Sequence, residues 1–198
     1  MGNRMAFGRQ EEIARTPSSE DERLMARLRT RDLKAFEELY RCYHARLSWF
    51  LIKLVHRPNL VEEIVNDTMM VVWEKPENFR GASKLSTWIF AIAYRKALNA
   101  LRRRDDPVED VPPEFQVSEE AQPDEPLQRQ QVEQVLLNAM GQLSADHRAV
   151  VDLTYFHEMS YREIAEIMNC PVDTIKTRMF HARRHLKRIL AGELADWL

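Results

Sequence analysis

The chain has 198 residues, of which 44% are apolar and 30% charged, and its 29 Lys and Arg nearly balance its 31 Asp and Glu. This length corresponds to one or two domains, and no apolar stretch approaches the roughly 20 residues that cross a bilayer. The N-terminal residues lack the apolar segment of a secretory signal, and the 2 Cys residues lack the spacing of a zinc site or a disulfide framework. We therefore expect a cytoplasmic protein with no metal, no cofactor and no membrane insertion.

The N-terminal part of the chain predicts helices. Residues 1–20 carry no recognisable motif and are expected to form a tail. Over residues 36–54 apolar positions recur at steps of three and four, which predicts one long amphipathic helix that Pro58 breaks. The same period continues over residues 61–75 and predicts a second helix. Because no segment alternates in the manner of a strand, we expect an all-α fold.

The polar side of this second helix is acidic and amide-rich. It carries Glu62, Glu63, Asn66 and Asp67, with Glu74 two turns further on. Such a face suits a basic protein partner better than it suits nucleic acid. Simple solvation of the helix is the alternative that the pattern leaves open.

A loop and a third helix follow, and together they predict contacts with a single nucleic-acid strand. The loop of residues 78–86 contains Gly81, which permits unusual backbone dihedrals, and Arg80 and Lys84, which suit phosphates. The helix is predicted to end at Arg104, and one of its faces aligns Trp88, Ala91, Arg95, Asn99 and Arg102. An aromatic ring, an amide and two guanidinium groups on one stripe suit stacking on an unpaired base and neutralisation of phosphates. The alternative is a core tryptophan with solvated arginines.

Residues 105–127 are expected to form an acidic linker between two folded units, residues 21–104 and 128–198. From residue 105 to residue 126 the chain has nine acidic residues, five prolines and no Lys or Arg. Such a segment cannot bury enough apolar surface to offset the entropy of ordering it. Basic clusters lie on both sides of the linker, so the layout predicts two contacts with a polyanion. A solvated tether between charged helices explains the same pattern.

The C-terminal unit predicts helices separated by two short turns. The expected segments are residues 144–158, 160–169 and 171 onward. Ser160 with Glu163 three residues later is a capping-box pattern, and Asn169 suits the left-handed backbone of a turn. Pro171 lies where a first-turn proline is tolerated. These signals indicate a DNA-binding helix-turn-helix, and a helical hairpin that binds no DNA is the alternative.

The last helix has apolar residues on one face and an unusual outer face. The outer face carries Thr177, Phe180, His181, Arg184 and Arg188, with Lys176 at its edge. An outward-facing phenylalanine among basic residues is hard to explain structurally, whereas the first turns of such a helix read base edges in the major groove. Tyr161 and Arg162, at the start of the preceding helix, are expected to hold the phosphate backbone.

Four segments in a fixed order carry a family resemblance. They are Asp32–Tyr40, Val61–Trp73, Phe79–Ala93 and Met159–Arg183. In these segments the chain resembles the bacterial sigma-70 family, specifically the small extracytoplasmic-function (ECF) sigma factors, over about residues 22–192. In the order given, they resemble the family's first conserved region, its clamp-binding helix, the segment that melts and reads the minus-10 promoter element, and the domain that reads the minus-35 element.

The resemblance implies two helical domains, a sigma region 2 bundle in residues 21–104 and a sigma region 4 helix-turn-helix in residues 128–198. It further implies binding to core RNA polymerase, through the β′ clamp helices and the β flap. The residues that would bind the clamp helices are Glu62, Glu63, Asn66 and Asp67. The acidic linker would then thread toward the RNA exit channel. An anti-sigma factor that covers the polymerase-binding faces of both domains is the other expected partner.

By the same resemblance, two sets of residues contact promoter DNA. The minus-10 set comprises Phe79, Arg80, Ser83, Lys84, Trp88, Phe90, Ile92, Ala93, Arg95 and Asn99. The minus-35 set comprises Tyr161, Arg162, Lys176, Thr177, Arg178, Phe180, His181, Arg183 and Arg184. Phe79 and the loop through Lys84 would receive a base flipped out of the non-template strand.

The predicted function is that of a sigma factor without an active site, which directs core RNA polymerase to promoters by reading both elements. A stand-alone dimeric helix-turn-helix repressor is the rival, and it requires a symmetric operator and binding without polymerase. The acidic linker and the acidic helix face argue against it. An enzyme would need convergent catalytic residues or a phosphate-cradling loop, and the 5 Gly residues form no Gly-rich motif.

Overall fold

The computed structural model describes residues 18–103, 135, 136 and 138–195, and every regular element in these residues is a helix. The prediction of an all-α fold is confirmed for this part of the chain. The predicted tail up to residue 17 and the predicted acidic linker of residues 105–127 lie outside the described residues.

The N-terminal bundle consists of four α-helices and one short 3₁₀ helix. They are α1 (Ser19–Arg29), α2 (Leu33–Val55), α3 (Pro58–Glu74), η1 (Pro76–Asn78) and α4 (Leu85–Arg103). The spacing of apolar residues did not predict α1 as a separate helix, although Ser18 caps it with a complete capping box. Arg31, with a φ of 62°, turns the chain, and Asp32 then caps α2 through the amides of Lys34 and Ala35.

The helix break predicted at Pro58 is present, since α2 ends at Val55, but two prolines also begin the next elements. Pro58 is the first residue of α3 and Pro76 is the first residue of η1. A proline fits there because the first helical position needs no amide hydrogen and its fixed φ suits the helix. The end of α2 is set instead by His56, which has left-handed backbone with a φ of 53°.

The C-terminal bundle consists of α6 (Ala145–Tyr155), α7 (Tyr161–Met168) and α8 (Val172–Ala195). The predicted caps are confirmed, because Ser160 and Glu163 form a complete capping box and Asn169 ends α7 in the left-handed region with a φ of 50°. Pro171 lies just before α8, and its carbonyl accepts hydrogen bonds from the amides of Thr174 and Ile175.

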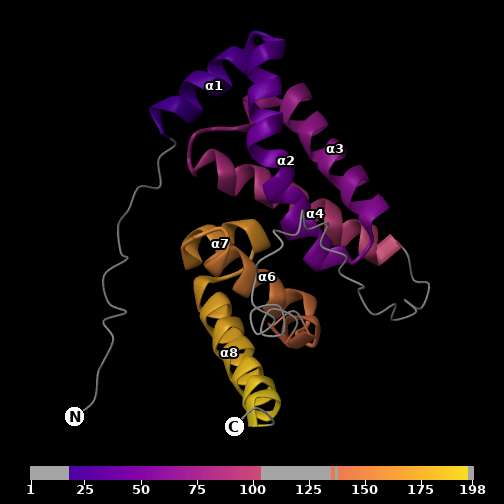
Figure 1. Cartoon of the computed structure of the whole chain (residues 1–198). Coiled ribbons are helices and arrows are strands. Elements are labelled where there is room, and N and C mark those ends of the chain that lie inside the picture. The colour runs from indigo at the N-terminus through magenta and orange to yellow at the C-terminus, as the bar shows by residue number, and fades with distance from the viewer. Residues whose placement is uncertain (1–17, 104–134, 137, 196–198) are drawn as a thin grey trace, which may run out of the picture.

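The two bundles pack directly against each other (Figure 1). One cluster of buried hydrophobic side chains runs through both. Helix α7 lies on α4, and α6 lies on α2. At the centre of this contact, the ring of His157 meets the rings of Phe50 and Phe90, with centroids 6.2 Å and 4.7 Å away. We call this contact between the bundles the seam. It brings together parts of the chain that the sequence pattern treated as separate units.

Candidate nucleic-acid interface

The outer face of α8 is open to solvent. Thr177, Phe180 and His181 are all exposed, and Phe180 has 62% of its surface accessible. The opposite face is buried through Ile175, Met179 and Ala182. The predicted division of this helix into an inner apolar face and an outer face is therefore confirmed. Because the helix leaves this aromatic ring in solvent, the ring can make an apolar contact with a ligand, for example with a thymine methyl group.

Two basic residues of α8 are held by partners in the same bundle. The guanidinium of Arg178 forms an ion pair with Asp146 at 2.5 Å. Lys176, at the outer edge, pairs with Asp173 at 3.0 Å, and both side chains remain largely exposed. Arg184 is exposed one helical turn after Phe180. Helix α8 thus carries two basic side chains held in ion pairs and an exposed arginine.

A third basic residue of α8, Arg183, is held by an aromatic side chain of α6. Arg183 donates a hydrogen bond to the hydroxyl of Tyr155 at 2.7 Å, and its guanidinium lies 5.8 Å from the centroid of that ring. A cation over an aromatic face loses side-chain freedom before any ligand arrives. Arg183 is therefore positioned beside α8 in the absence of DNA.

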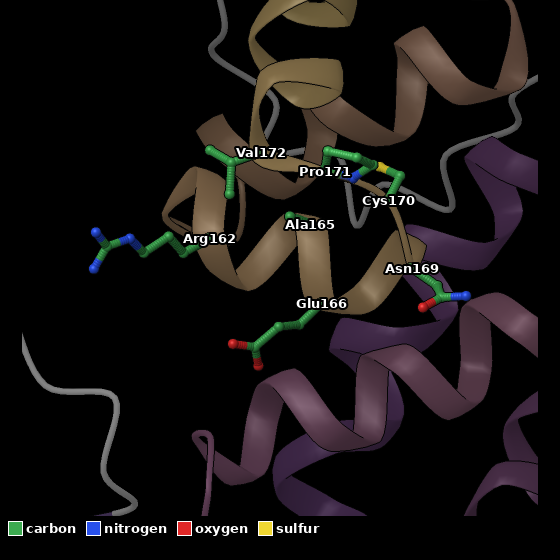
Figure 2. Close-up of a pocket in the computed structure, with 7 residues that line it drawn as sticks. All are labelled: Arg162, Ala165, Glu166, Asn169, Cys170, Pro171 and Val172. Carbon is green, nitrogen blue, oxygen red and sulfur yellow. The ribbon is translucent and has the colours of Figure 1, made fainter.

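The start of α7 borders an open pocket at the turn between α7 and α8. Its lining comprises Arg162, Ala165, Glu166, Asn169, Cys170, Pro171 and Val172. Figure 2 shows that Arg162 and Glu166 extend outward from α7, while Ala165 faces the turn at Pro171 and Val172. The small side chain of Ala165 lets the two helices cross closely. Tyr161, the first residue of α7, is half-buried, so its backbone amide and that of Arg162 lie at a helix N-terminus suited to an anion.

Helix α4 divides the minus-10 set between its surface and the core. Arg80, Arg95 and Asn99 are exposed. Ser83, Lys84 and Trp88 are partly exposed. The buried members are Phe79, Phe90, Ile92 and Ala93, none more than 6% exposed. The exposed stripe that was predicted on α4 is therefore present, but the predicted base-receiving residue, Phe79, packs inside the bundle.

The burial of Phe79 has a clear local cause. Its ring packs against Trp88 with centroids 5.4 Å apart, and its carbonyl accepts a hydrogen bond from Arg29 of α1 at 3.0 Å. Helix α1, which the sequence pattern did not separate, thus closes the loop from one side. The role of Phe79 toward a base stays a prediction.

The acidic face of α3 is exposed, as predicted. Glu62, Glu63, Asn66 and Asp67 all reach solvent. Neighbouring helices fix part of this face: the hydroxyl of Tyr40 donates to Asn66 at 3.2 Å, and Lys96 pairs with Asp67 at 2.9 Å. His44 lies 3.4 Å from Glu62. The face is therefore a preformed acidic and amide surface on the side of α3 away from its core contacts.

The seam contains polar residues that the sequence analysis missed. Arg148 of α6 is 7% exposed and donates to the carbonyls of Met140 and Leu143 in its own bundle at 3.0 Å and 2.9 Å. It also donates to the carbonyl of Lys53 in α2 at 2.7 Å. Lys53 in turn pairs with Asp152, which is 1% exposed, at 2.5 Å. One guanidinium therefore joins the two bundles through backbone carbonyls.

The electrostatics of the seam follow from this burial. Burial lowers the pKa of Arg148. Partial burial and the neighbouring Arg148 guanidinium lower the pKa of His56, whose ring nitrogen contacts that guanidinium. Burial, and then the nearby Asp146 carboxylate that accepts its hydroxyl at 3.1 Å, raise the pKa of Tyr94. A signal for these residues exists in the sequence, because Arg148 and Asp152 lie one turn apart in a segment whose other residues are mostly apolar.

Other classes of site find no support in the described residues. Among them, no group of His, Cys, Asp and Glu could hold a metal ion. No helix within the same residues is long and apolar enough to span a membrane.

Two family models match the chain. The model described as "Sigma-70 region 2" matches residues 39–106, and the model described as "Sigma-70, region 4" matches residues 133–186. The first match covers α3 and α4 and most of α2, and the second covers α6, α7 and the exposed face of α8. The exposed residues described above on α3, α4 and α8 thus fall inside the matched regions.

Curated relatives and solved structures agree with these matches. The chain is 30% identical over 161 residues to the ECF RNA polymerase sigma factor RpoE of Cereibacter sphaeroides, covering 80% of this chain and 87% of the relative. It is 28% identical over 187 residues to the RNA polymerase sigma-H factor of Pseudomonas aeruginosa, covering 89% and 97%. Among structures, it is similar to the sigma factor RpoE in complex with the anti-sigma factor NepR from Bartonella quintana, with a TM-score of 0.63, 29% identity and coverage of 80% and 98%.

Proposed function

The chain belongs to the ECF group of the sigma-70 family of RNA polymerase sigma factors, and from this premise we propose that it binds core RNA polymerase and directs transcription initiation at promoters with minus-35 and minus-10 elements. The observation that carries the proposal is the outer face of α8, where an exposed Phe180 stands among basic residues inside the region 4 match. A solvent-exposed ring has little structural use there, whereas the major groove offers it an apolar partner.

Recognition of the minus-35 duplex is assigned to the start of α8. Lys176, Thr177, Phe180 and His181 lie on one exposed face and can enter the major groove together. Arg183 and Arg184 follow them and suit the flanking phosphates. Tyr161 and Arg162 hold the backbone at the N-terminus of α7. Arg178 acts from the edge, where Asp146 fixes its guanidinium.

Recognition of the minus-10 strand is assigned to the loop before α4 and to the stripe along that helix. Arg80, Ser83 and Lys84 meet the phosphates, and Trp88, Arg95 and Asn99 meet the bases and backbone of the unpaired strand. The buried Phe79, Phe90, Ile92 and Ala93 support this surface from below in the arrangement described. A flipped base reaches Phe79 once the loop opens.

Attachment to the polymerase is assigned to the acidic face of α3. Glu62, Glu63, Asn66 and Asp67 present carboxylates and an amide to the basic β′ clamp helices, and the C-terminal bundle meets the β flap. In this role the protein supplies specificity, and nucleotidyl transfer belongs to the polymerase. We expect it to work in the cytoplasm and to be held inactive by an anti-sigma factor, as RpoE of Bartonella quintana is bound by NepR.

The test is a promoter selection. The purified chain is mixed with core RNA polymerase and a library of randomised promoter DNA, and transcripts are sequenced against a reaction with core polymerase alone. We expect enrichment of DNA that carries two elements at a fixed spacing. Tight binding to a palindrome without polymerase, and no enrichment in the transcription arm, would instead establish the dimeric repressor.

A further inference from the structure

A groove lies between the start of α6 and the middle of α8, on the C-terminal bundle. It has a volume of about 610 Å³, and the charged or titratable residues that line it are His147, His181, Arg184, His185 and Arg188. Among the described residues of its lining, none is acidic. We call it the histidine groove. Three imidazoles and two guanidinium groups around one hollow provide hydrogen-bond donors for an anion without a competing carboxylate.

The histidines of the groove lie close together although they come from two helices. The ring centroids of His147 in α6 and His181 in α8 are 6.3 Å apart. The Nδ1 of His185 lies 3.0 Å from the guanidinium of Arg188, which can only donate, so the neutral imidazole carries its hydrogen on Nε2. Within the part of the chain that the structure describes, this Nε2 is buried and has no hydrogen-bond partner. The histidine groove therefore borders a donor that the protein itself does not use.

The charges around His147 disfavour its protonation in the free protein. Burial, and next the neighbouring His181, lower its pKa, and Arg178 and His185 of α8 act in the same direction. Asp146 of α6 opposes them, but its carboxylate is already paired with Arg178 at 2.5 Å. An anion in the histidine groove would supply the missing negative charge and raise this pKa again. Anion binding and protonation of His147 therefore favour each other.

The histidine groove continues the outer face of α8. His181 follows Phe180 on that exposed face and also lines the groove, and Arg184 is exposed one turn after Phe180. At a rise of about 1.5 Å per residue, α8 advances roughly 10 Å from His181 to Arg188. When the first turns of such a helix enter the major groove, its later turns lie at the level of the phosphates. The DNA backbone is therefore the polyanion nearest to this site.

We propose that the histidine groove is a phosphate-binding site that holds the DNA backbone beside the minus-35 element, with tighter binding once His147 is protonated. The inference rests on the proposed function, because it extends the surface that α8 presents to duplex DNA. It adds a contact from α6, a helix outside both sets of residues expected to meet promoter DNA. It also makes binding of this DNA sensitive to pH between about 6 and 7.5, where imidazoles titrate.

The test compares variants of the full-length protein on one DNA probe at two pH values. The probe is a fluorescein-labelled duplex that carries the minus-35 element recovered in the promoter selection, and EDTA is present throughout. We expect the wild type to bind about fivefold more tightly at pH 6.0 than at pH 7.5. His147→Gln should match the wild type at pH 7.5, because neutral His147 contributes little, and should lose most of this gain at pH 6.0. A structural effect of the substitution would weaken binding equally at both pH values and would overturn the inference.

Salt dependence gives an independent readout with a matched control on α8. Arg188 lines the histidine groove, whereas Lys187, the exposed residue before it, does not. Arg188→Gln should reduce the slope of log Kd against log salt concentration by about 0.9, the value for one lost phosphate contact, and Lys187→Gln should leave the slope unchanged. Equal changes in the two variants would assign the effect to net charge and exclude a built site. Arg188→Gln also tests the groove if His147→Gln folds poorly.

Inorganic phosphate separates the site from the assigned source of its phosphate. The ring NMR signals of His147 are followed over pH in phosphate and in chloride solutions of equal ionic strength, and His147→Gln assigns them. We expect the pKa of His147 to be higher in phosphate. A phosphate response combined with wild-type DNA binding by His147→Gln at pH 6.0 would mark a site for free phosphate, and the assignment to the DNA backbone would be wrong.

The outcomes separate this inference from the proposed function. The absence of a pH-dependent gain in the wild type, or of duplex binding at either pH, overturns the phosphate site. In either case the promoter selection, which uses the holoenzyme, still decides the function. A promoter selection that recovers no sequence overturns the function and, with it, the assignment of this site to DNA.

Discussion

The two surfaces predicted to read promoter DNA differ in what covers them. On α8 the reading face is open, and Phe180 is 62% exposed. On α4 the strand-binding surface begins under α7, with Lys84 and Thr87 bound to Glu163. The difference teaches that two surfaces predicted for the same ligand can differ in accessibility, because one lies away from the contact between the bundles and the other borders it. The predicted duplex-reading face is therefore exposed along α8, whereas one end of the predicted strand-binding surface is in contact with α7.

The physical origin of each state is also different. The open face of α8 follows from its own amphipathic period, since Ile175, Met179 and Ala182 bury the opposite side. The seam that borders α2 and α4 combines the shared hydrophobic core with polar pairs from a distant part of the chain, at Arg148, Asp146 and Glu163. Substitutions at the seam should therefore change stability, and substitutions on the exposed face of α8 should change DNA affinity alone.

The largest effect is expected from Arg148→Met. This change leaves the carbonyls of Met140, Leu143 and Lys53 without their shared donor in a buried site. We expect the free energy of unfolding to fall by about 3 kcal/mol, because unsatisfied buried polar groups keep their full desolvation cost. Urea denaturation followed by circular dichroism measures it.

The matched control for that experiment is Arg184→Met on the open face of α8. Arg184 is exposed, so the same change in side chain should shift stability by no more than about 0.5 kcal/mol. If both variants lost the same free energy of unfolding, the hydrogen bonds of Arg148 at the seam would not stabilise the fold more than an exposed arginine on α8 does. The proposed contrast between the two surfaces would then be wrong.

The second effect concerns affinity. Thr177→Ala combined with Phe180→Ala removes exposed side chains from α8, so stability should stay unchanged. The loss of each base contact should cost about 1–3 kcal/mol of binding free energy at the minus-35 element. Footprinting of the holoenzyme on a selected promoter and on a minus-35 scrambled template measures this loss. A variant that binds both templates as the wild type does would remove α8 from the recognition surface.

Much of the open surface could be predicted from the sequence. Ser160, Glu163 and Asn169 set the ends of α7 through local hydrogen bonds and backbone preferences, which act within a few residues. The period of α8 predicted which face is buried, because apolar spacing at 3.6 residues per turn is itself the cause of that burial. The prolines were harder to interpret, since Pro58 fits the first turn of a helix as well as it breaks one.

The closed surface could not be predicted in the same way. Periodicity shows that a face is covered, but it does not show by which element, and the contact of α7 with α4 joins residues about 76 positions apart, as in the pair Thr87 and Glu163. The same limit explains why Phe79 was expected to be accessible, since its cover includes Arg29 of α1. Arg148 could not be singled out from the sequence, because one of its acceptors, the carbonyl of Lys53, lies 95 positions away in the other bundle.

A third and smaller effect separates polymerase binding from both DNA surfaces. Asn66→Ala with Asp67→Ala alters the exposed face of α3, which takes no part in the seam contacts described above. We expect core polymerase to bind about 1 kcal/mol more weakly, with unchanged stability of the free protein. Competition for core polymerase against the wild-type protein measures it, and Glu37→Ala, which removes an exposed charge from α2, is the control. Equal losses in both variants would assign the effect to net charge.

The smallest expected effect is a pH dependence of stability through His56. Its pKa is lowered in the closed structure by partial burial and by Arg148, so the open or unfolded chain binds the extra proton first. The contribution of a neutral His56 is therefore complete above about pH 6.5 and is lost as the pH falls toward the lowered pKa. The free energy of unfolding, measured by urea denaturation, should fall modestly from pH 7.5 to pH 5.5, and His56→Gln should flatten that response. Since the side chain is partly exposed, a loss as large as that of Arg148→Met would mean that another group at the seam carries it, and a response that survives in His56→Gln would exclude His56.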